Sequence, residues 1–473
     1  MIRARFAPSP TGYLHIGSAR TFIFNWLYAR RNGGTMVLRI DDTDVDRNTE
    51  TSLNSIYEGL NWLDLGWDEF YRQSERLELH RKLAYDLLAK DLAYRDFTPA
   101  IAESEGHAHS EGPWLCNPEM RALSETESKE RAENGEPFVI RFRVQREPVY
   151  ELKFTDEVYG EQSKLTADIE DFALLRSNGM PTYHLASCAD DIDFKITHII
   201  RGQDHLSNTF KHILLFQAAG DHLPRFAHLP LLIAPDGAKL SKRKHGPVVS
   251  VMTYRDNGFL SLAYINFLCL LGWSPKDNRE QMTLDELKGS FGFEGVHRSN
   301  AVVNFSEVDP IDPKALWLNT QHLRSMPIDQ LTPLVRLSLE EHHLKPYGDE
   351  AFFRHVVDTV RTRYATLLDF SIKGRAYFAD NFHMEPAAKD KLDAPGAREL
   401  LRELASRLQA NPDFSEGSVE GELRKLAEER GVKAGLLINA SRAALTGQTV
   451  GPSAFAVFVC IGRERTIERL RKV

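Results

Sequence analysis

The sequence predicts an α/β fold: a doubly wound parallel sheet, interrupted by an inserted α+β subdomain and followed by a mostly α-helical C-terminal domain. Strand-like apolar runs alternate with amphipathic helical runs at the start of the chain and again in residues 179–246, as in a parallel sheet. The stretch between these regions is polar, and beyond about residue 321 only helical periodicity is found. With 473 residues, of which 42% are hydrophobic, the chain is long enough for several domains.

Residues 1–95 are expected to form the first half of the sheet. Residues 3–7 predict a strand, two prolines and two glycines predict a tight loop, and a helical run covers residues 19–31. In such folds ligands bind at the carboxyl ends of the strands, which is where this loop emerges. The further elements expected here are a strand at 36–40 and helices at about 52–65 and 74–90.

The loop after the first strand is suited to phosphate. Its small residues let backbone N–H groups and a helix N-terminus approach a polyanion closely. Its glycine spacing matches neither of the well-known glycine-rich phosphate loops, so an ordinary strand-to-helix turn is the alternative. His15 at the mouth of the loop favours phosphate, because an imidazole N–H can donate to it.

An inserted α+β subdomain is expected over residues 96–178. The stretch 124–136 is rich in polar residues, whereas apolar residues alternate over 138–144 and mark a strand.

The second half of the sheet is expected over residues 179–246. Its predicted elements are strands at 183–186, 196–200 and 229–233 and a helix at about 209–219.

A basic loop ends this second half at residues 235–246. It is a turn followed by Lys239, Lys242, Arg243 and Lys244, with glycine on both sides. The pattern favours a mobile cationic loop, and a solvated surface turn is the alternative.

The remainder of the chain is expected to be helical. We expect a connecting segment at 247–320 and a helical domain at 321–473, formed by two sub-bundles that divide near residue 375. The predicted helices are 260–271, 284–291, 331–341, 351–365, 397–408, 420–430 and 463–472.

Composition narrows the class of protein. The formal net charge is −8, so nucleic acid would have to meet local basic patches. The four cysteines form no closely spaced pair, which favours a reducing cytoplasm over a disulfide framework or a cysteine-rich zinc site. The longest apolar run, 262–273, contains Asn266 and is too short to span a bilayer, so we expect neither export nor a membrane anchor.

Two separate stretches resemble the paired ATP-handling motifs of class I aminoacyl-tRNA synthetases. They are residues 14–17 (Leu-His-Ile-Gly) and 239–243 (Lys-Leu-Ser-Lys-Arg), in the expected order and on the two halves of the sheet. Other stretches are similar to glutamyl-tRNA synthetase of the bacterial type, and the likeness covers nearly the whole chain. These stretches are 6–12, 39–44, 181–186, 200–208, 442–447 and 451–452.

The resemblance implies a Rossmann-like catalytic domain that attaches L-glutamate to the 3′ end of tRNA(Glu), using ATP with Mg²⁺ and passing through a glutamyl-adenylate. It implies that His15, Lys239 and Lys242 are catalytic. The residues implied to bind ATP are Pro8, Ser9, Pro10, Thr11, Gly12, Tyr13, Leu14, His15, Ile16, Gly17, Ser18, Lys239, Leu240, Ser241, Lys242 and Arg243. Those implied to bind glutamate are Arg5, Ala7, Ser9, Asp41, Tyr183 and Arg201, where arginine suits planar capture of a carboxylate.

The resemblance also implies how tRNA is bound. The subdomain at 96–178 would receive the acceptor end, residues 247–320 would follow the inside of the L, and Arg363 and Arg442 would contact the anticodon. Charging of tRNA(Gln) as well stays open, and a cytoplasmic monomer is expected. No structural zinc is expected, because residues 94–97 contain no cysteine and the surroundings of His107, His109 and Cys116 favour an ordinary loop.

Three other classes of protein share part of this pattern. Glutaminyl-tRNA synthetase shares the catalytic half, but its C-terminal part is built from β-barrels. A shortened paralogue that attaches glutamate to a modified base of aspartate tRNA lacks a C-terminal domain. A non-catalytic paralogue would bind tRNA or an adenylate without needing the residues of the two ATP-handling motifs.

Overall fold

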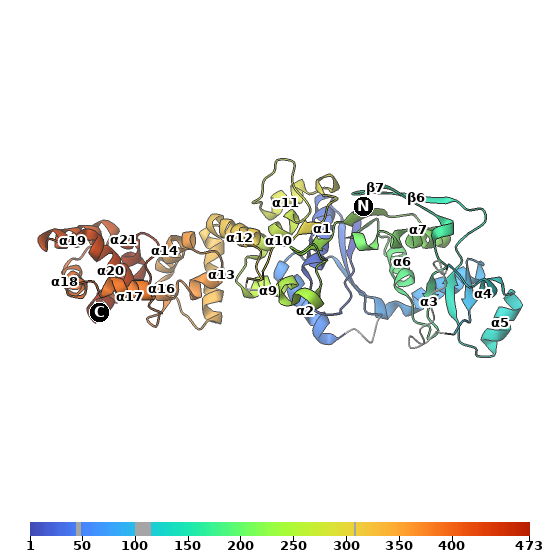
Figure 1. The fold of residues 1–473 in the computed structure, drawn as a ribbon, viewed down its shortest axis with the longest axis horizontal. Coiled ribbons are helices and arrows are strands. Elements are labelled where there is room, and N and C mark those ends of the chain that lie inside the picture. Colours follow the sequence, from blue (N-terminus) through green and yellow to red (C-terminus); the bar gives the residue numbers. More distant parts are fainter. Residues whose placement is uncertain (44–48, 100–114, 307–308) are drawn as a thin grey trace. The chain divides into compact units, whose positions relative to one another are not determined.

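The computed structural model describes residues 1–43, 49–99, 115–306 and 309–473, apart from the side chains of Lys242, Arg243 and Pro247. The chain forms two compact units (Figure 1). The first comprises Met1–Thr253 and Ile265–Asp312, and the second comprises Tyr254–Tyr264 and Pro313–Val473.

A seven-stranded sheet organises the first unit, with strand order β3-β2-β1-β9-β10-β6-β7. Neighbouring strands are parallel except for the antiparallel pair β6 and β7. Chain order runs outward from β1 through β2 to β3, and in the opposite direction from β9 to β10, so β1 and β9 flank the switch point at which such sheets bind ligands. The strands are β1 (Arg3–Phe6), β2 (Thr35–Ile40), β3 (Glu69–Arg72), β6 (Glu151–Asp156), β7 (Gly160–Leu165), β9 (His198–Gly202) and β10 (Arg225–Leu229).

Helices cover the sheet and confirm the doubly wound α/β prediction. Helix α1 packs against β1, β2 and β9, while α3, α6 and α7 pack on one another over a core that includes Val37, Leu185 and Ile199. The helices are α1 (Ile16–Arg31), α2 (Glu50–Leu63), α3 (Leu77–Ala89), α6 (Tyr183–Asp193), α7 (Asn208–Ala219) and α11 (Leu284–Ser290).

The strand predicted at 183–186 is wrong, because these residues form the first turn of α6. Thr182 caps this helix in an extended conformation, and Leu185, Ala186 and Ala189 are buried at helical spacing. A four-residue apolar run does not distinguish a strand from the start of a buried helix.

The stretch predicted as an inserted subdomain contributes to two sheets. An antiparallel sheet of order β4-β5-β8 is accompanied by two helices, whereas β6 and β7 extend the main sheet beyond β10. These elements are β4 (Ala93–Asp96), β5 (Val139–Phe142), β8 (Ala173–Leu175), α4 (Pro118–Ala122) and α5 (Glu125–Glu133).

Short elements follow the second half of the main sheet. They are β11 (Leu232–Ile233), α8 (Lys242–His245), α9 (Val251–Asp256), α10 (Ser261–Leu270) and β12 (Ala301–Val302). The paired strands β11 and β12 are parallel.

The second unit is helical throughout the part that the structure describes, as the sequence predicts. One core cluster includes residues from both sides of position 375, such as Val357 and Leu404. Its helices after residue 312 are α12 (Pro313–Ser325), α13 (Ile328–Glu341), α14 (Glu350–Val360), α15 (Leu368–Ser371), α16 (Arg375–Phe378), α17 (Pro386–Leu392), α18 (Ala397–Ala410), α19 (Glu416–Glu429), α20 (Ala434–Thr446), α21 (Ala454–Ile461) and α22 (Arg463–Lys472).

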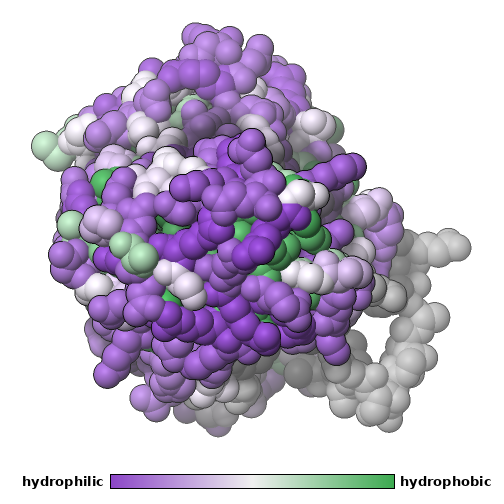
Figure 2. Space-filling model, turned by 90° about the vertical axis from the view of Figure 1, so that its left-hand side faces the viewer, coloured by the Kyte–Doolittle hydropathy of each residue, from purple (hydrophilic) through white to green (hydrophobic). Residues whose placement is uncertain are grey.

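The surface seen in Figure 2 is largely hydrophilic, with smaller hydrophobic areas, as is usual for a face in contact with water. Among the helices of the described residues, none combines the length and apolar character needed to cross a bilayer.

Candidate active site

A cavity of about 540 Å³ opens at the carboxyl ends of β1 and β9, on the switch point of the sheet. The loop after β1, the start of α1, the start of α6, the end of β9 and the segment before α8 form its walls. The predicted site residues that line it are Arg5, Ala7, Ser9, Pro8, Thr11, Gly12, Tyr13, Leu14, His15, Gly17, Ser18, Asp41, Tyr183, Arg201, Lys239, Leu240 and Ser241. The structure therefore brings both predicted motifs and the predicted glutamate residues to one cavity.

His15 caps the first helix at the cavity wall. Its Nδ1 accepts the backbone N–H of Gly17 at 3.0 Å, so in the neutral ring the proton lies on Nε2. A Cβ at Gly17 would lie 3.3 Å from that Nδ1, which is tighter than an ordinary contact, so the imidazole would have to shift slightly to admit a side chain there. Ile16, by contrast, is fully buried in the core rather than in the cavity lining.

The basic loop reaches the cavity through Lys239. Its Nζ lies 2.8 Å from the Asp204 carboxylate, in an exposed pair of the kind that contributes little stability and exchanges readily for another anion. Tyr13 Oη donates to the carbonyl oxygen of Gly246 at 2.7 Å and so links the loop after β1 to the end of the basic loop. The predicted side chains of Lys242 and Arg243 lie outside the described residues.

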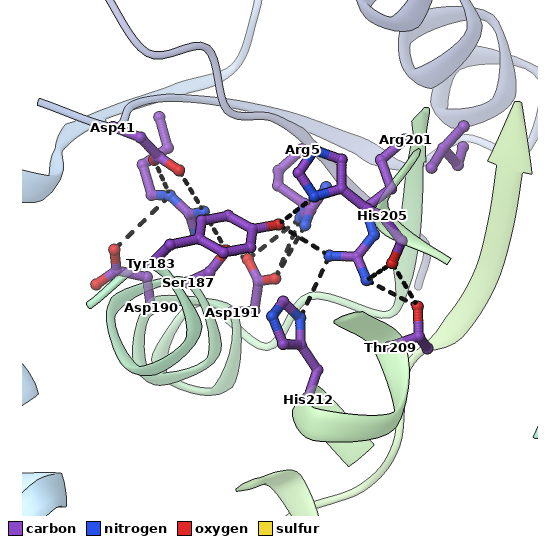
Figure 3. A network of polar contacts seen from close by, with 12 residues as sticks. Arg5, Asp41, Tyr183, Ser187, Asp190, Asp191, Arg201, His205, Thr209 and His212 are labelled. Carbon is purple, nitrogen blue, oxygen red and sulfur yellow. Dashed lines mark hydrogen bonds and ion pairs between the residues drawn. The ribbon is translucent and has the colours of Figure 1, made fainter. Parts of the chain in front are cut away.

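Arg5 and Arg39 share the buried carboxylate of Asp191 on α6, which Figure 3 shows beside Arg5. Arg5 Nη2 lies 3.2 Å from Asp191 Oδ2, and Arg39 Nη1 lies 2.8 Å from Asp191 Oδ1. Arg39 also donates to Ser187 Oγ at 3.0 Å. The ionic partner of Arg5 is thus Asp191.

Asp41 is held at the cavity by Arg39, whose Nε lies 2.6 Å from Asp41 Oδ1. Burial raises the pKa of Asp41 above its ordinary value, with repulsion from Asp190 and Asp191 adding to it, although Arg39 acts in the opposite direction. A second cation beside Asp41 would offset that cost. The site is therefore suited to an ammonium group.

Arg201 is a buried cation surrounded by neutral acceptors. Only 6% of it is exposed, and burial lowers the pKa of its guanidinium. Its Nη1 donates to Tyr183 Oη at 3.1 Å, as Figure 3 shows. Within the described ranges no carboxylate forms an ion pair with it. Because an arginine in a protein stays charged, Arg201 offers a binding partner for an anion.

Several buried polar residues of the site were not assigned from the sequence. Asp190 and Asp191 interrupt an otherwise apolar helix face, and a buried carboxylate usually has a charged partner. That pattern was a usable signal. Asp156, Thr209, His212 and His228 carried no comparable local signal, since they come together only in the folded sheet.

The two predicted anticodon residues belong to the second unit and are not among the residues that line the cavity. Arg363 is exposed at the end of a short 3₁₀ turn, Arg361–Arg363. Arg442 Nη1 donates to the carbonyl oxygen of Pro452 at 2.7 Å. Burial lowers the pKa of Arg442, and the charge of Arg363 acts in the same direction.

Among the described residues no group of three or more His, Cys, Asp or Glu side chains is arranged to hold a metal ion. His107 and His109 lie outside those residues, and Cys116 is a free, partly buried thiol.

Comparison with known proteins adds independent findings. A family described as "tRNA synthetases class I (E and Q), catalytic domain" matches residues 1–310, and an "Anticodon binding domain" family matches residues 336–473. The chain is 52% identical over 477 residues to a glutamate–tRNA ligase of Solibacter usitatus, covering 99% of this chain and 98% of that one. It is 44% identical to glutamate–tRNA ligase 2 of Koribacter versatilis, covering 100% and 97%.

A solved structure is similar over the whole length as well. It is the crystal structure of a glutamate tRNA ligase from Elizabethkingia meningosepticum in complex with its amino acid, with a TM-score of 0.84 and 31% sequence identity. The match covers 100% of this chain and 98% of that one.

Proposed function

The chain belongs to the class I tRNA synthetases of the glutamate and glutamine group, and we propose that it attaches L-glutamate to the 3′ end of tRNA(Glu). The observation that carries the proposal is the cavity, which is lined by Arg201, Asp41, His15 and Lys239. Arg201 is buried there, and no carboxylate of the described residues forms an ion pair with it. These groups are matched to an amino acid with a side-chain carboxylate and to a triphosphate.

The reaction proceeds in two transfers. The α-carboxylate of glutamate attacks the α-phosphorus of MgATP, the bond to the β-phosphate oxygen breaks, and pyrophosphate leaves. A terminal hydroxyl of the tRNA then attacks the carbonyl carbon of the glutamyl-adenylate, and AMP leaves. Positioning and charge stabilisation are the protein's main contributions to such transfers.

Glutamate is oriented by charges at both ends. Arg201 and Tyr183 receive the side-chain carboxylate, and Asp41 receives the ammonium group. Glutamine would place a neutral amide beside the buried Arg201 cation, losing charge-assisted bonds worth about 1.5–3 kcal/mol each.

ATP is bound by the loop after β1 and by the basic loop. The helix N-terminus capped by His15 supplies backbone N–H groups, and the proton on His15 Nε2 can donate to a phosphate oxygen. Lys239 leaves Asp204 for the phosphates, and Lys242 acts with it from the basic loop. The loop thereby follows the charge that develops on the leaving pyrophosphate.

We assign tRNA contacts along the chain in the expected order. Residues 96–178 receive the acceptor end, residues 247–320 follow the inside of the L, and the helical segment 321–473 reads the anticodon through Arg363 and Arg442. The active protein is a cytoplasmic monomer. Whether tRNA(Gln) is charged as well depends on the contact with the anticodon.

The alternatives have less support. A glutaminyl-tRNA synthetase would carry β-barrels where the described part of the second unit is helical. The shortened paralogue would lack that unit. A non-catalytic paralogue would not need His15 and Lys239 on the same cavity as Arg201.

Aminoacylation of purified tRNA(Glu) and tRNA(Gln) with labelled glutamate and glutamine tests the proposal. We expect glutamate to be attached to tRNA(Glu), with pyrophosphate and AMP released. Attachment of glutamine in its place would overturn the amino-acid assignment.

A further inference from the structure

The orientation of Arg201 depends on side chains that lie beneath the cavity. Its Nε donates to His228 Nε2 at 3.2 Å, and its Nη2 donates to Thr209 Oγ1 at 2.8 Å. Its Nη1 lies 3.1 Å from Tyr183 Oη and 3.3 Å from His212 Nδ1. The acceptors around the guanidinium therefore decide which way its two outer nitrogens face.

His228 is bound from its other side by Asp156. Nδ1 of His228 lies 2.6 Å from Asp156 Oδ2, and both side chains are fully buried. Burial would raise the pKa of Asp156, but hydrogen bonds from His228 and from backbone N–H groups bring it below its ordinary value. Burial also lowers the pKa of His228. Asp156 is thus an ionised acceptor, and His228 is a neutral ring.

These two states fix the tautomer of His228. A neutral imidazole carries one proton, and the ionised Asp156 draws it to Nδ1. Nε2 is then an acceptor, which is what the Nε–H of Arg201 requires.

We propose that Asp156 is a positioning residue for the amino-acid substrate: it sets the tautomer of His228, which holds the Arg201 guanidinium in the orientation that receives the side-chain carboxylate. The inference rests on the proposed function, because it takes Arg201 as the group that binds glutamate.

The surroundings of Asp156 make a single-atom test available. Its Oδ1 accepts the backbone N–H groups of Val158 and Tyr159, each at 2.9 Å, while Oδ2 faces the His228 ring. The backbone N–H of His228 is shared between the two oxygens, at 3.3 Å from Oδ1 and 3.1 Å from Oδ2. Asp156→Asn keeps the amide oxygen on these three N–H groups and turns the amide NH₂ toward the His228 ring. Nδ1 must then accept, the ring proton moves to Nε2, and two N–H groups face each other at Arg201.

Steady-state aminoacylation with saturating tRNA measures the effect. We expect Asp156→Asn to raise KM for glutamate about tenfold to a hundredfold, the range for losing a hydrogen bond to a charged group, with KM for ATP unchanged. Loss of structure alone would not separate the two substrates.

Asp171→Asn is the matched control. Asp171 is equally buried, its Oδ1 accepts the Val144 N–H at 3.0 Å and an Arg146 N–H at 3.2 Å, and its Oδ2 pairs with Arg121. Among the described residues, none of these partners forms a hydrogen bond with Arg201 or His228. We expect this variant to leave KM for glutamate at the wild-type value.

A double-mutant cycle tests the route through the imidazole. His228→Gln presents an amide oxygen to Arg201 whatever the proton state of the ring would have been, so Asp156→Asn should add no further rise in KM for glutamate in that background. If Asp156→Asn does not fold, His228→Leu is compared with His228→Gln: leucine removes the acceptor and should raise KM for glutamate, and glutamine should restore it.

The outcomes separate the two proposals. A wild-type protein that charges no glutamate overturns the proposed function. The positioning role alone is overturned if the wild-type protein attaches glutamate and Asp156→Asn keeps the wild-type KM for glutamate. It is also overturned if the variant raises KM for glutamate and KM for ATP alike. An Asp156→Asn effect that persists undiminished in the His228→Gln background also overturns it.

Discussion

Arg39 and Arg201 are both buried beside the cavity, yet replacing each by glutamine is expected to have different consequences for stability. Arg39 lies 2.6 Å from Asp41 and 2.8 Å from Asp191. Arg39→Gln leaves buried carboxylates without their shared cation, and breaking a buried ion pair in this way costs about 3–5 kcal/mol of unfolding free energy. Arg201 has neutral acceptors, so Arg201→Gln loses hydrogen bonds but also removes a buried charge, for a net change within about 1.5 kcal/mol.

Although Arg201→Gln is expected to change stability little, it should lower activity strongly. Two charge-assisted bonds from Arg201 to the glutamate side chain are worth about 1.5–3 kcal/mol each, so Arg201→Gln should lower kcat/KM for glutamate by about two to four orders of magnitude. KM for ATP should stay at its wild-type value, because we assign Arg201 to glutamate and not to ATP.

Denaturant titration at fixed pH gives the free energies of unfolding, and steady-state aminoacylation gives the kinetic constants. The reasoning is refuted if Arg201→Gln loses as much stability as Arg39→Gln, since Arg201 would then have an ionic partner. It is refuted equally if Arg201→Gln keeps near wild-type kcat/KM for glutamate.

Three further outcomes follow from the same geometry. Burial raises the pKa of Asp41, so KM for glutamate should rise as pH falls through that raised value, and a pH series on Asp41→Asn should lack this dependence. Lys239→Ala should lower kcat by about a hundredfold in an adenylate-formation assay. Lys244→Ala breaks only the exposed pair with Asp236 and should leave kcat unchanged, so equal losses in the two variants would contradict the assignment. Arg363→Gln should raise KM for tRNA(Glu) without changing KM for glutamate, and a filter-binding series would reveal an unaltered tRNA affinity if the assignment is mistaken.

The elements that carry their own periodicity were predictable from the sequence. Helix α1 buries Phe22, Ile23 and Leu27 and ends before a glycine pair, and both features are local. The C-terminal helices are predictable for the same reason. Strands β3 and β4 were not identified, because four residues of mixed polarity give too short a pattern.

Pairing between distant segments was not predictable in the same way. Strand β6 joins β10 through residues 156 and 226, so part of the region expected as a separate subdomain extends the main sheet. No pattern within β6 distinguishes that outcome from a self-contained hairpin. Register and neighbours of a strand depend on segments far away in the chain.

In the site, too, residues in local motifs were predictable, whereas their distant partners were not. Arg5, Asp41 and Arg201 stand in motifs that resemble the family, and the cavity brings them together. Their partners Asp191 and His228 come from positions about 186 and 27 residues away along the chain, so hydrogen bonds that orient the cations became visible only in the folded structure.

The most direct test of the central claim is competition between glutamate and glutamine for attachment to tRNA(Glu) by the wild-type protein. Two lost charge-assisted bonds at Arg201 predict a kcat/KM for glutamine at least about a hundredfold below that for glutamate. Equal kcat/KM values, or a preference for glutamine, would contradict the claim that Arg201 recognises a carboxylate in this cavity.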